Sequence, residues 1–321
     1  MIPGAIALVV AAVLGAAARA LGPRIGAVDV PAGELKPHPQ PVSYLGGMTV
    51  ALAIVAGLIA RGWPLRLAGA LGLAGALILG LVDDAIDLTP LSRLALQAAL
   101  AVGVVAGGLR ADALPGAVLA WVAAIVLFVV AMNGVNLVDG MDGLAAGAVV
   151  ISTAGLAAIA RSNGGGTGLA LVTSGAAAGF LFYNLPPARL FLGDGGAYLL
   201  GVVLAVSILH AGGSAESLAG AATCLGLFAL DPALAILRRR VNRLRLTEGD
   251  RGHLYDQLAA RGLGPVACLA ASWGAHTALV VAGIVAASLP TAAGVVFSVG
   301  VWAASIFALF SFGFVSYGPT P

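Results

Sequence analysis

The chain has 321 residues, of which 60% are hydrophobic and only 9% are charged, and its formal net charge is +2. Soluble domains carry about 25% charged residues, so this composition excludes a soluble globular protein. Apolar runs recur as far as the C-terminus, which excludes a signal peptide as their cause. The composition predicts an integral membrane protein with a single transmembrane domain over residues 1–321, in contact with membrane lipid and without a nucleic-acid partner.

The apolar runs have the length of membrane-spanning helices. A bilayer core needs about 20 apolar residues in a helix. Because a helix satisfies its own backbone hydrogen bonds in lipid, and because the alternating pattern of a membrane β-barrel is absent, we predict an all-α, polytopic bundle of about 10 or 11 transmembrane helices. The runs lie near 3–21, 44–60, 65–82, 92–108, 115–131, 144–160, 167–183, 196–210, 215–237, 264–288 and 291–314.

The basic residues are distributed unevenly over the connections between these runs. If every run crosses the membrane, most Lys and Arg residues fall on one side, including the run 238–240. The positive-inside rule places that side in the cytoplasm and the N-terminus outside. Most acidic residues fall on the same side, about which the rule says little. We therefore expect a multi-pass membrane protein with a polar site at its cytoplasmic face.

The first two polar segments lie after the first and third runs. The first is rich in proline, so it is either a stiff connector or a loop that offers Lys36 and His38 to an anionic ligand. The second contains Asp83 and Asp84 at the end of an apolar helix, where the carboxylates repel each other and face the negative end of the helix dipole. A solvated helix end, a catalytic proton or a Mg²⁺ ion would relieve this repulsion.

The segment 133–143 places two amides and two carboxylates between two apolar runs. If the segment is helical, Asn133, Asn136, Asp139 and Asp142 are each one turn apart and share one face. Its three glycines permit tight bends or close approach of a ligand. This spacing favours a functional site over a plain connecting loop.

Two further aspartates stand near or within apolar runs. Asp194 lies between glycines just before the eighth run, where it is either a helix cap or a metal-binding carboxylate. Asp231 lies inside the ninth run, and an acidic residue within the membrane is a functional candidate. The arginines that follow it either anchor the helix or bind anionic lipid head groups.

The segment after the ninth run combines phosphate-binding and proton-handling groups. It contains Asp250, Arg251, His253 and Asp256 within seven residues. Arginine binds phosphate with several donors, and histidine exchanges protons near neutral pH.

In chain order, these segments resemble the motifs of one family, the polyprenyl-phosphate N-acetylhexosamine-1-phosphate transferases. Leu81-Val82-Asp83-Asp84 resembles its paired-aspartate motif, and 133–144 resembles its central motif nearly residue for residue. Phe191-Leu192-Gly193-Asp194 resembles its metal-binding motif. The family includes phospho-MurNAc-pentapeptide translocase and the undecaprenyl-phosphate GlcNAc-1-phosphate transferases, and the resemblance extends from about Asp29 to Leu258.

This resemblance implies a Mg²⁺-dependent transfer, with Mn²⁺ as the alternative ion. A HexNAc-1-phosphate, with GlcNAc as the first choice, passes from a UDP-HexNAc donor to polyprenyl (undecaprenyl) phosphate with release of UMP, the initiating membrane step of cell-envelope glycan synthesis. The family also implies a homodimer in the cell (inner) membrane, with its active site at the cytoplasmic face. The implied roles are catalysis for Asp83, Asp84 and His253, metal binding for Asp194 and Asp139, and substrate binding for Lys36, Asn133, Asn136, Asp142, Asp250, Arg251 and Asp256.

Three alternatives stay open at this point. Many relatives carry two or three histidines where this chain has only His253, which favours the GlcNAc type over the MurNAc-pentapeptide type. A membrane transporter would suit Asp231, but transporters place their sites near mid-membrane, whereas these acids gather at one surface. A catalytically silent membrane scaffold is disfavoured because Asp83, Asp84 and Asp194 are all present. A one-step transfer and a two-step route with Asp83 as nucleophile are both compatible with the sequence.

Overall fold

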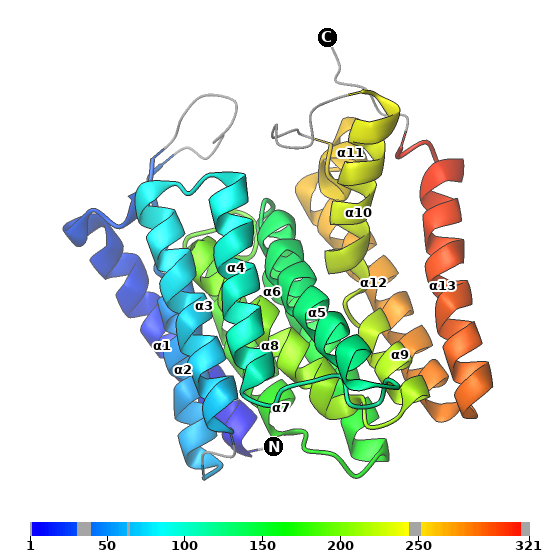
Figure 1. Ribbon diagram of the computed structural model, residues 1–321. Helices are drawn as coiled ribbons and strands as arrows, with labels where there is room; N and C mark the ends of the chain where they lie inside the picture. Colours follow the sequence, from blue (N-terminus) through cyan, green and yellow to red (C-terminus); the bar gives the residue numbers. More distant parts are fainter. Residues whose placement is uncertain (1, 31–39, 63–64, 244–251, 316–321) are drawn as a thin grey trace.

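The computed structural model describes residues 2–30, 40–62, 65–243 and 252–315, which are almost entirely α-helical (Figure 1). A short antiparallel pair, β1 (Val28–Asp29) and β2 (Val42–Ser43), packs beside the first helix. The helices of the described ranges are α1 (Ile2–Ile25), α2 (Gly46–Ala60), α3 (Leu67–Ile86), α4 (Pro90–Ala106), α5 (Ala117–Val138), α6 (Leu144–Ser162), α7 (Gly168–Asn184), α8 (Gly193–Ala211), α9 (Ala215–Thr223), α10 (Gly226–Val241), α11 (Leu254–Ala260), α12 (Pro265–Ser288) and α13 (Thr291–Ser311).

Every apolar run predicted from the sequence is helical. Among the described residues, seven helices are long and apolar enough to cross a membrane, and the bent pair α9–α10 would make an eighth. The helices α2, α4 and α7 are apolar but shorter. The all-α, polytopic fold is therefore confirmed. The helix α1 begins at one end of the bundle and α13 ends at the other (Figure 1), while the side that faces the cytoplasm stays a prediction.

The predicted helical face over 133–142 is wrong in its second half. The helix α5 ends at Val138, so Asp139 is its C-cap and Asp142 lies in the turn that leads to α6. The turn closes at Gly143, whose φ of +77° is a left-handed conformation that side chains disfavour. Only Asn133 and Asn136 therefore keep the helical spacing.

The predicted single span over 215–237 is a broken helix. The helix α9 ends at Thr223, α10 begins at Gly226, and the two axes differ by 70°. The break redirects α10 toward the end of the bundle where α11 lies (Figure 1).

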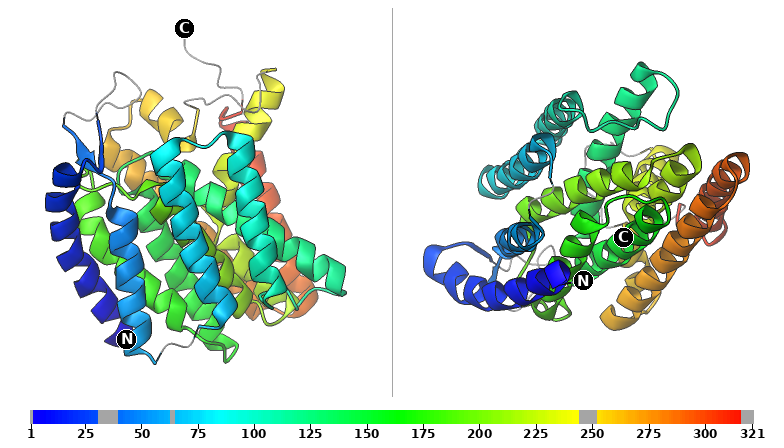
Figure 2. Two further views of the ribbon diagram at one scale, coloured as in Figure 1. Left: turned by 60° about the vertical axis from the view of Figure 1, so that its left-hand side comes forward. Right: turned by 90° about the horizontal axis from the view of Figure 1, so that it is seen from below.

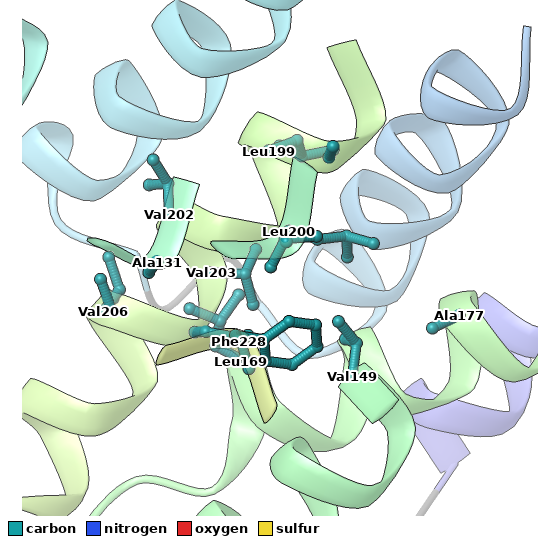
Figure 3. Packing of buried hydrophobic residues seen from close by; sticks show 14 of the residues in the cluster. Ala131, Val149, Leu169, Ala177, Leu199, Leu200, Val202, Val203, Val206 and Phe228 are labelled. Carbon is teal, nitrogen blue, oxygen red and sulfur yellow. The ribbon is translucent and has the colours of Figure 1, made fainter. Parts of the chain in front are cut away.

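The helix α8 occupies the centre of the bundle (Figure 2), and α2, α3, α5 and α6 pack around it. In the 18-residue apolar stretch of α8, 83% of the residues are buried. Leu199, Leu200, Val202, Val203 and Val206 point in several directions into a packed core (Figure 3). Lipid is as apolar as these side chains, so close packing rather than escape from water holds such helices together. Packing on all sides fixes the position of α8 and of the residues at its start.

Candidate active site

The carboxylate of Asp84 caps the start of α8. Its two oxygens accept hydrogen bonds from the backbone N–H of Asp194 at 2.9 Å and of Gly195 at 3.2 Å. The N-terminal N–H groups of a helix lack intrahelical partners and carry a partial positive charge. The charge of Asp84 is therefore unfavourable at the end of its own helix α3 but is stabilised by the neighbouring helix α8. This contact joins the paired-aspartate segment to the Asp194 segment.

This junction depends on close approach of α3 to α8 at Gly80. A methyl group at Gly80 would lie 2.3 Å from the carbonyl oxygen of Asp194, which is far inside van der Waals contact. Only glycine allows the two backbones to meet at this distance.

Asp83 is almost fully buried and makes contacts through both oxygens. The Nε atom of Arg93 lies 2.7 Å from Oδ2, and Nη2 of Arg93 donates to Oδ1 at 3.1 Å. The Tyr198 hydroxyl donates to Oδ2 at 2.5 Å, and the Leu88 N–H donates to Oδ1 at 3.0 Å. The Arg93 charge thus neutralises Asp83 inside the protein. To act as a base or nucleophile, Asp83 would first have to release these partners.

Asp194 lies in the first turn of α8, where α4 and α5 supply its contacts. The side-chain amide of Asn136 donates to Oδ1 of Asp194. The Nη2 atom of Arg93 lies 3.9 Å from Oδ2, and the Asp194 side chain is 27% exposed. The structure therefore brings together the three segments that the sequence predicted to meet, through Asp84, Asn136 and Asp194.

Asp139 completes an acidic cluster at the end of α5. The pKa of its carboxyl lies well above the usual range, first because the surrounding protein shields it from water and then because Asp194, Asp84 and Asp142 are negative neighbours. A cation placed among these groups would offset both effects.

A magnesium ion suits this donor set as an open site. Within the described ranges, no three His, Cys, Asp or Glu side chains are arranged to enclose a metal by themselves. Mg²⁺ commonly takes only one or two carboxylates and completes its shell with water and substrate phosphate. Hard oxygen donors, partial exposure at Asp194 and the negative neighbours that raise the pKa of Asp139 fit that pattern.

Two predicted substrate residues make hydrogen bonds that hold neighbouring segments together. The Asn133 amide donates to Gln97 of α4 and to the carbonyl of Val129. Oδ2 of Asp142 accepts a 2.8 Å hydrogen bond from the Ala188 N–H, which ties the turn after α5 to the loop after α7. Their roles in substrate binding stay predictions.

His253 begins α11 and is oriented by Asp231 from α10. The ring Nδ1 lies 2.6 Å from Oδ2 of Asp231, and the Leu254 N–H donates to Oδ1 at 2.7 Å. Because Asp231 already accepts from Leu254 and offers its second carboxylate oxygen to the ring, we assign the ring proton to Nδ1. Asp256, predicted to bind substrate, accepts from the His253 backbone N–H at 3.2 Å and so caps α11.

The α11 segment lies against the acidic turn. Tyr255 stacks on His253 with ring centroids 5.6 Å apart. A methyl group at Gly140 would meet the Tyr255 hydroxyl at 2.0 Å, so Tyr255 contacts the turn beside Asp139. The structure thus connects the histidine segment to the carboxylate cluster through Tyr255.

Sequence reasoning omitted Arg93 and Tyr198 from the site. Tyr198 lies four residues after Asp194, so helical spacing alone could have suggested it. Arg93 follows Asp83 by ten residues across a turn between helices, and no local pattern reveals that the two meet. Lys36, Asp250 and Arg251 lie outside the described residues, and their assignments stay predictions.

Comparison with known proteins identifies the class. The family model described as glycosyl transferase family 4 matches residues 67–212, the part that contains α3 to α8 and its acidic cluster. A relative that covers most of the chain is similar to it as well, and the chain belongs to this family. It is a transferase built into a polytopic membrane fold.

That relative is a "probable undecaprenyl-phosphate N-acetylglucosaminyl 1-phosphate transferase" from Bacillus subtilis (strain 168). It is 31% identical over 257 residues, which are 75% of this chain and 72% of the relative. A phospho-N-acetylmuramoyl-pentapeptide-transferase from Chlamydia trachomatis serovar L2 is 47% identical over 77 residues, only 22% of this chain and 23% of the relative. The corresponding enzyme of Synechococcus sp. (strain RCC307) is 41% identical over 101 residues, 30% of this chain and 28% of the relative.

Proposed function

We propose that this protein transfers GlcNAc-1-phosphate from UDP-GlcNAc to undecaprenyl phosphate and releases UMP. The main support for this proposal is that Asp84 and Asn136 both contact Asp194 at one end of the bundle. The Bacillus subtilis relative, which matches over three quarters of the chain, has the corresponding name. The matches to pentapeptide transferases are short, which supports GlcNAc as the sugar.

We assign the ion site to Asp194 and Asp139. These two carboxylates would hold Mg²⁺, which supplies charge neutralisation for a pyrophosphate. Asn136 holds the Asp194 carboxylate through its amide, while Asp84 holds the backbone at the same position. The two contacts fix where the Asp194 oxygens point.

We further propose direct transfer in one step. An oxygen of the lipid phosphate attacks the β-phosphorus, the bond from that phosphorus to the bridging oxygen breaks, and UMP leaves with the oxygen. The engagement of Asp83 by Arg93, Tyr198 and Leu88 supports this route over nucleophilic attack by Asp83. Arg93 is 25% exposed between Asp83 and Asp194, where its guanidinium is available to a phosphate.

His253 is the proposed proton-handling group of the second segment. Because Asp231 holds the proton on Nδ1, the lone pair of the neutral ring lies on Nε2. The acceptor enters from the membrane and the donor from the side where the basic connections gather, which we propose to be the cytoplasm.

The decisive assay measures UMP release. The purified protein is incubated with undecaprenyl phosphate, Mg²⁺ and, in separate reactions, UDP-GlcNAc, another UDP-HexNAc or UDP-MurNAc-pentapeptide. We expect UMP only when lipid and ion are both present, with the highest rate for UDP-GlcNAc. EDTA should abolish the rate, Mg²⁺ should restore it, and Mn²⁺ should serve as a substitute. Faster turnover of the pentapeptide donor would move the protein to the other branch, and no UMP with any donor would refute the proposal.

A further inference from the structure

The break between α9 and α10 lies inside the bundle and exposes backbone groups that a continuous helix would pair. In lipid there is no water to satisfy such groups, and each unsatisfied group is costly. The carbonyl of Cys224 and the N–H of Leu227 stand on either side of the break. Both find partners on other helices.

A chain of three hydrogen bonds spans the break. The Leu227 N–H donates to Nδ1 of His276 on α12 at 3.2 Å. The ring Nε2 lies 2.8 Å from the Ser152 hydroxyl on α6, which donates to the Cys224 carbonyl at 2.7 Å. The ring of His276 and the hydroxyl of Ser152 are both fully buried. We call these four groups the break network.

The directions of these hydrogen bonds determine which ring nitrogen of His276 carries the proton. Since Nδ1 of His276 accepts from a backbone N–H, it carries no proton. Nε2 therefore carries the proton and donates to Ser152, whose own proton goes to the Cys224 carbonyl. With a neutral His276 ring, every donor of the break network meets an acceptor. The ring therefore has the hydrogen-bonding groups that the break requires.

Apolar packing around α10 is uneven. On one side α10 packs against α5, and Phe228 in its first turns is buried in the core (Figure 3). On the other side a cavity of about 330 Å³ is lined by residues of α10, α12 and α13. Asp231 and His276 both line this cavity. Side-chain packing therefore leaves the direction of α10 incompletely fixed on the α12 side.

We infer that His276 is a positioning residue, which holds the bend of α9–α10 through the break network and thereby aims Asp231 at His253. This inference rests on the proposed function only for its effect on turnover. The hydrogen bonds of His276 and Ser152 hold the start of α10. Asp231 lies one turn further along this helix, so its position depends on them. An altered bend would carry the carboxylate away from the ring that it orients.

The direct test measures the position of α10. Cys224 and Cys268 are replaced by alanine, and spin labels are attached to cysteines introduced by Ile236→Cys on α10 and Val281→Cys on α12, two exposed positions. We expect a narrow distance distribution that shifts or broadens in His276→Ala. A second label pair, Val281 with the exposed Phe182 on α7, leaves α10 out and should not change.

Turnover gives the second readout. A small misplacement far from the reacting atoms can cost about 100-fold in rate, and we expect kcat of His276→Ala to fall by at least about tenfold. The KM for the donor should change by less than about threefold, since the carboxylates proposed to hold the ion of its pyrophosphate, Asp194 and Asp139, do not depend on α10. His276→Asn offers an acceptor to Leu227 but cannot reach Ser152, so it should restore both readouts in part.

Matched serine variants keep the test decisive if His276→Ala does not fold. Ser152→Ala breaks the network at its centre. Ser272→Ala removes an equally buried hydroxyl that has no hydrogen-bond partner within the described ranges. Ser152→Ala should shift the label distance and lower kcat, whereas Ser272→Ala should do neither. An unchanged label distance in His276→Ala, or in Ser152→Ala if the first variant does not fold, overturns the inference, as does an unchanged kcat. The distance needs no turnover, so failure of the proposed function would be recognised separately.

Discussion

The two halves of the site are held in place by different means. The carboxylate centre stands at the start of α8, which is packed on all sides and joined to α3 and α5 by direct contacts at Asp84 and Asn136. The histidine segment depends on α10, which follows a 70° break and borders a cavity. Helix packing sets the position of the first half, while a few polar contacts set that of the second. Substitutions should therefore affect the two halves differently.

The largest expected loss comes from the rigid half. Asp194→Ala removes the proposed ion carboxylate and the acceptor of the Asn136 amide. Loss of one preorganised electrostatic group costs on the order of 1,000-fold in kcat, and we expect at least this loss in UMP release. Folding should be retained, because Asp84 bonds the backbone N–H of this residue and not its side chain.

A control acid separates this effect from a general change of charge. Asp112→Asn alters an exposed carboxylate that lies 3.4 Å from Arg110 on the opposite side of the predicted topology. Its rate should equal that of the unmodified protein. Activity of Asp194→Ala near that of Asp112→Asn would remove Asp194 from the mechanism.

The next effect concerns the second half. Asp231 accepts from both His253 and Leu254, whereas asparagine at this position would place a donor against one of them. We expect Asp231→Asn to lower kcat by about 100-fold, the scale of one positioned proton-transfer group. Steady-state UMP assays measure this value.

A double-mutant cycle sharpens that prediction. If Asp231 acts through His253, the double variant Asp231→Asn/His253→Gln should be no slower than the slower single variant. Multiplicative losses would show that the two residues act separately.

A smaller effect tests the close contact of α3 with α8. The added methyl of Gly80→Ala would lie 2.3 Å from the Asp194 carbonyl, so the helices must separate. Such overpacking costs about 1–3 kcal/mol of stability, which thermal unfolding in detergent would detect. Gly103→Ala on α4 meets nothing within 4 Å, and since alanine favours a helix more than glycine does, this variant should not lower the unfolding temperature. Equal unfolding temperatures for the two variants would contradict the packing of α3 on α8.

The smallest effect is expected at Tyr198. Tyr198→Phe removes one hydrogen bond to Asp83, but Arg93 and Leu88 still hold that carboxylate. We expect a loss of about 1 kcal/mol in stability and a change in kcat of no more than about fivefold. A loss as large as that of Asp194→Ala would instead give Tyr198 a direct part in the reaction.

The membrane class, the helical runs and the gathering of the polar segments on one side could all be predicted from the order of residues alone. These follow from local chemistry, since each helix in lipid must pair its own backbone groups and its length must match the bilayer. The order of the runs also predicted that Asp83, Asp84, Asn136 and Asp194 would share one end of the bundle, and the structure confirms that meeting.

The contacts between side chains, and the positions of protons within them, became known only from the packing of the helices. All runs are similarly apolar and rich in small residues, so nothing local marks α8 as the central helix or Gly80 as a contact point. Asp83 and its partner Arg93 are 10 positions apart in the sequence, and Leu227 and its partner His276 are 49 positions apart. Such contacts depend on how helices pack against one another. In lipid a helix forms from its own sequence, but which helices become neighbours depends on the complementary shapes of their surfaces.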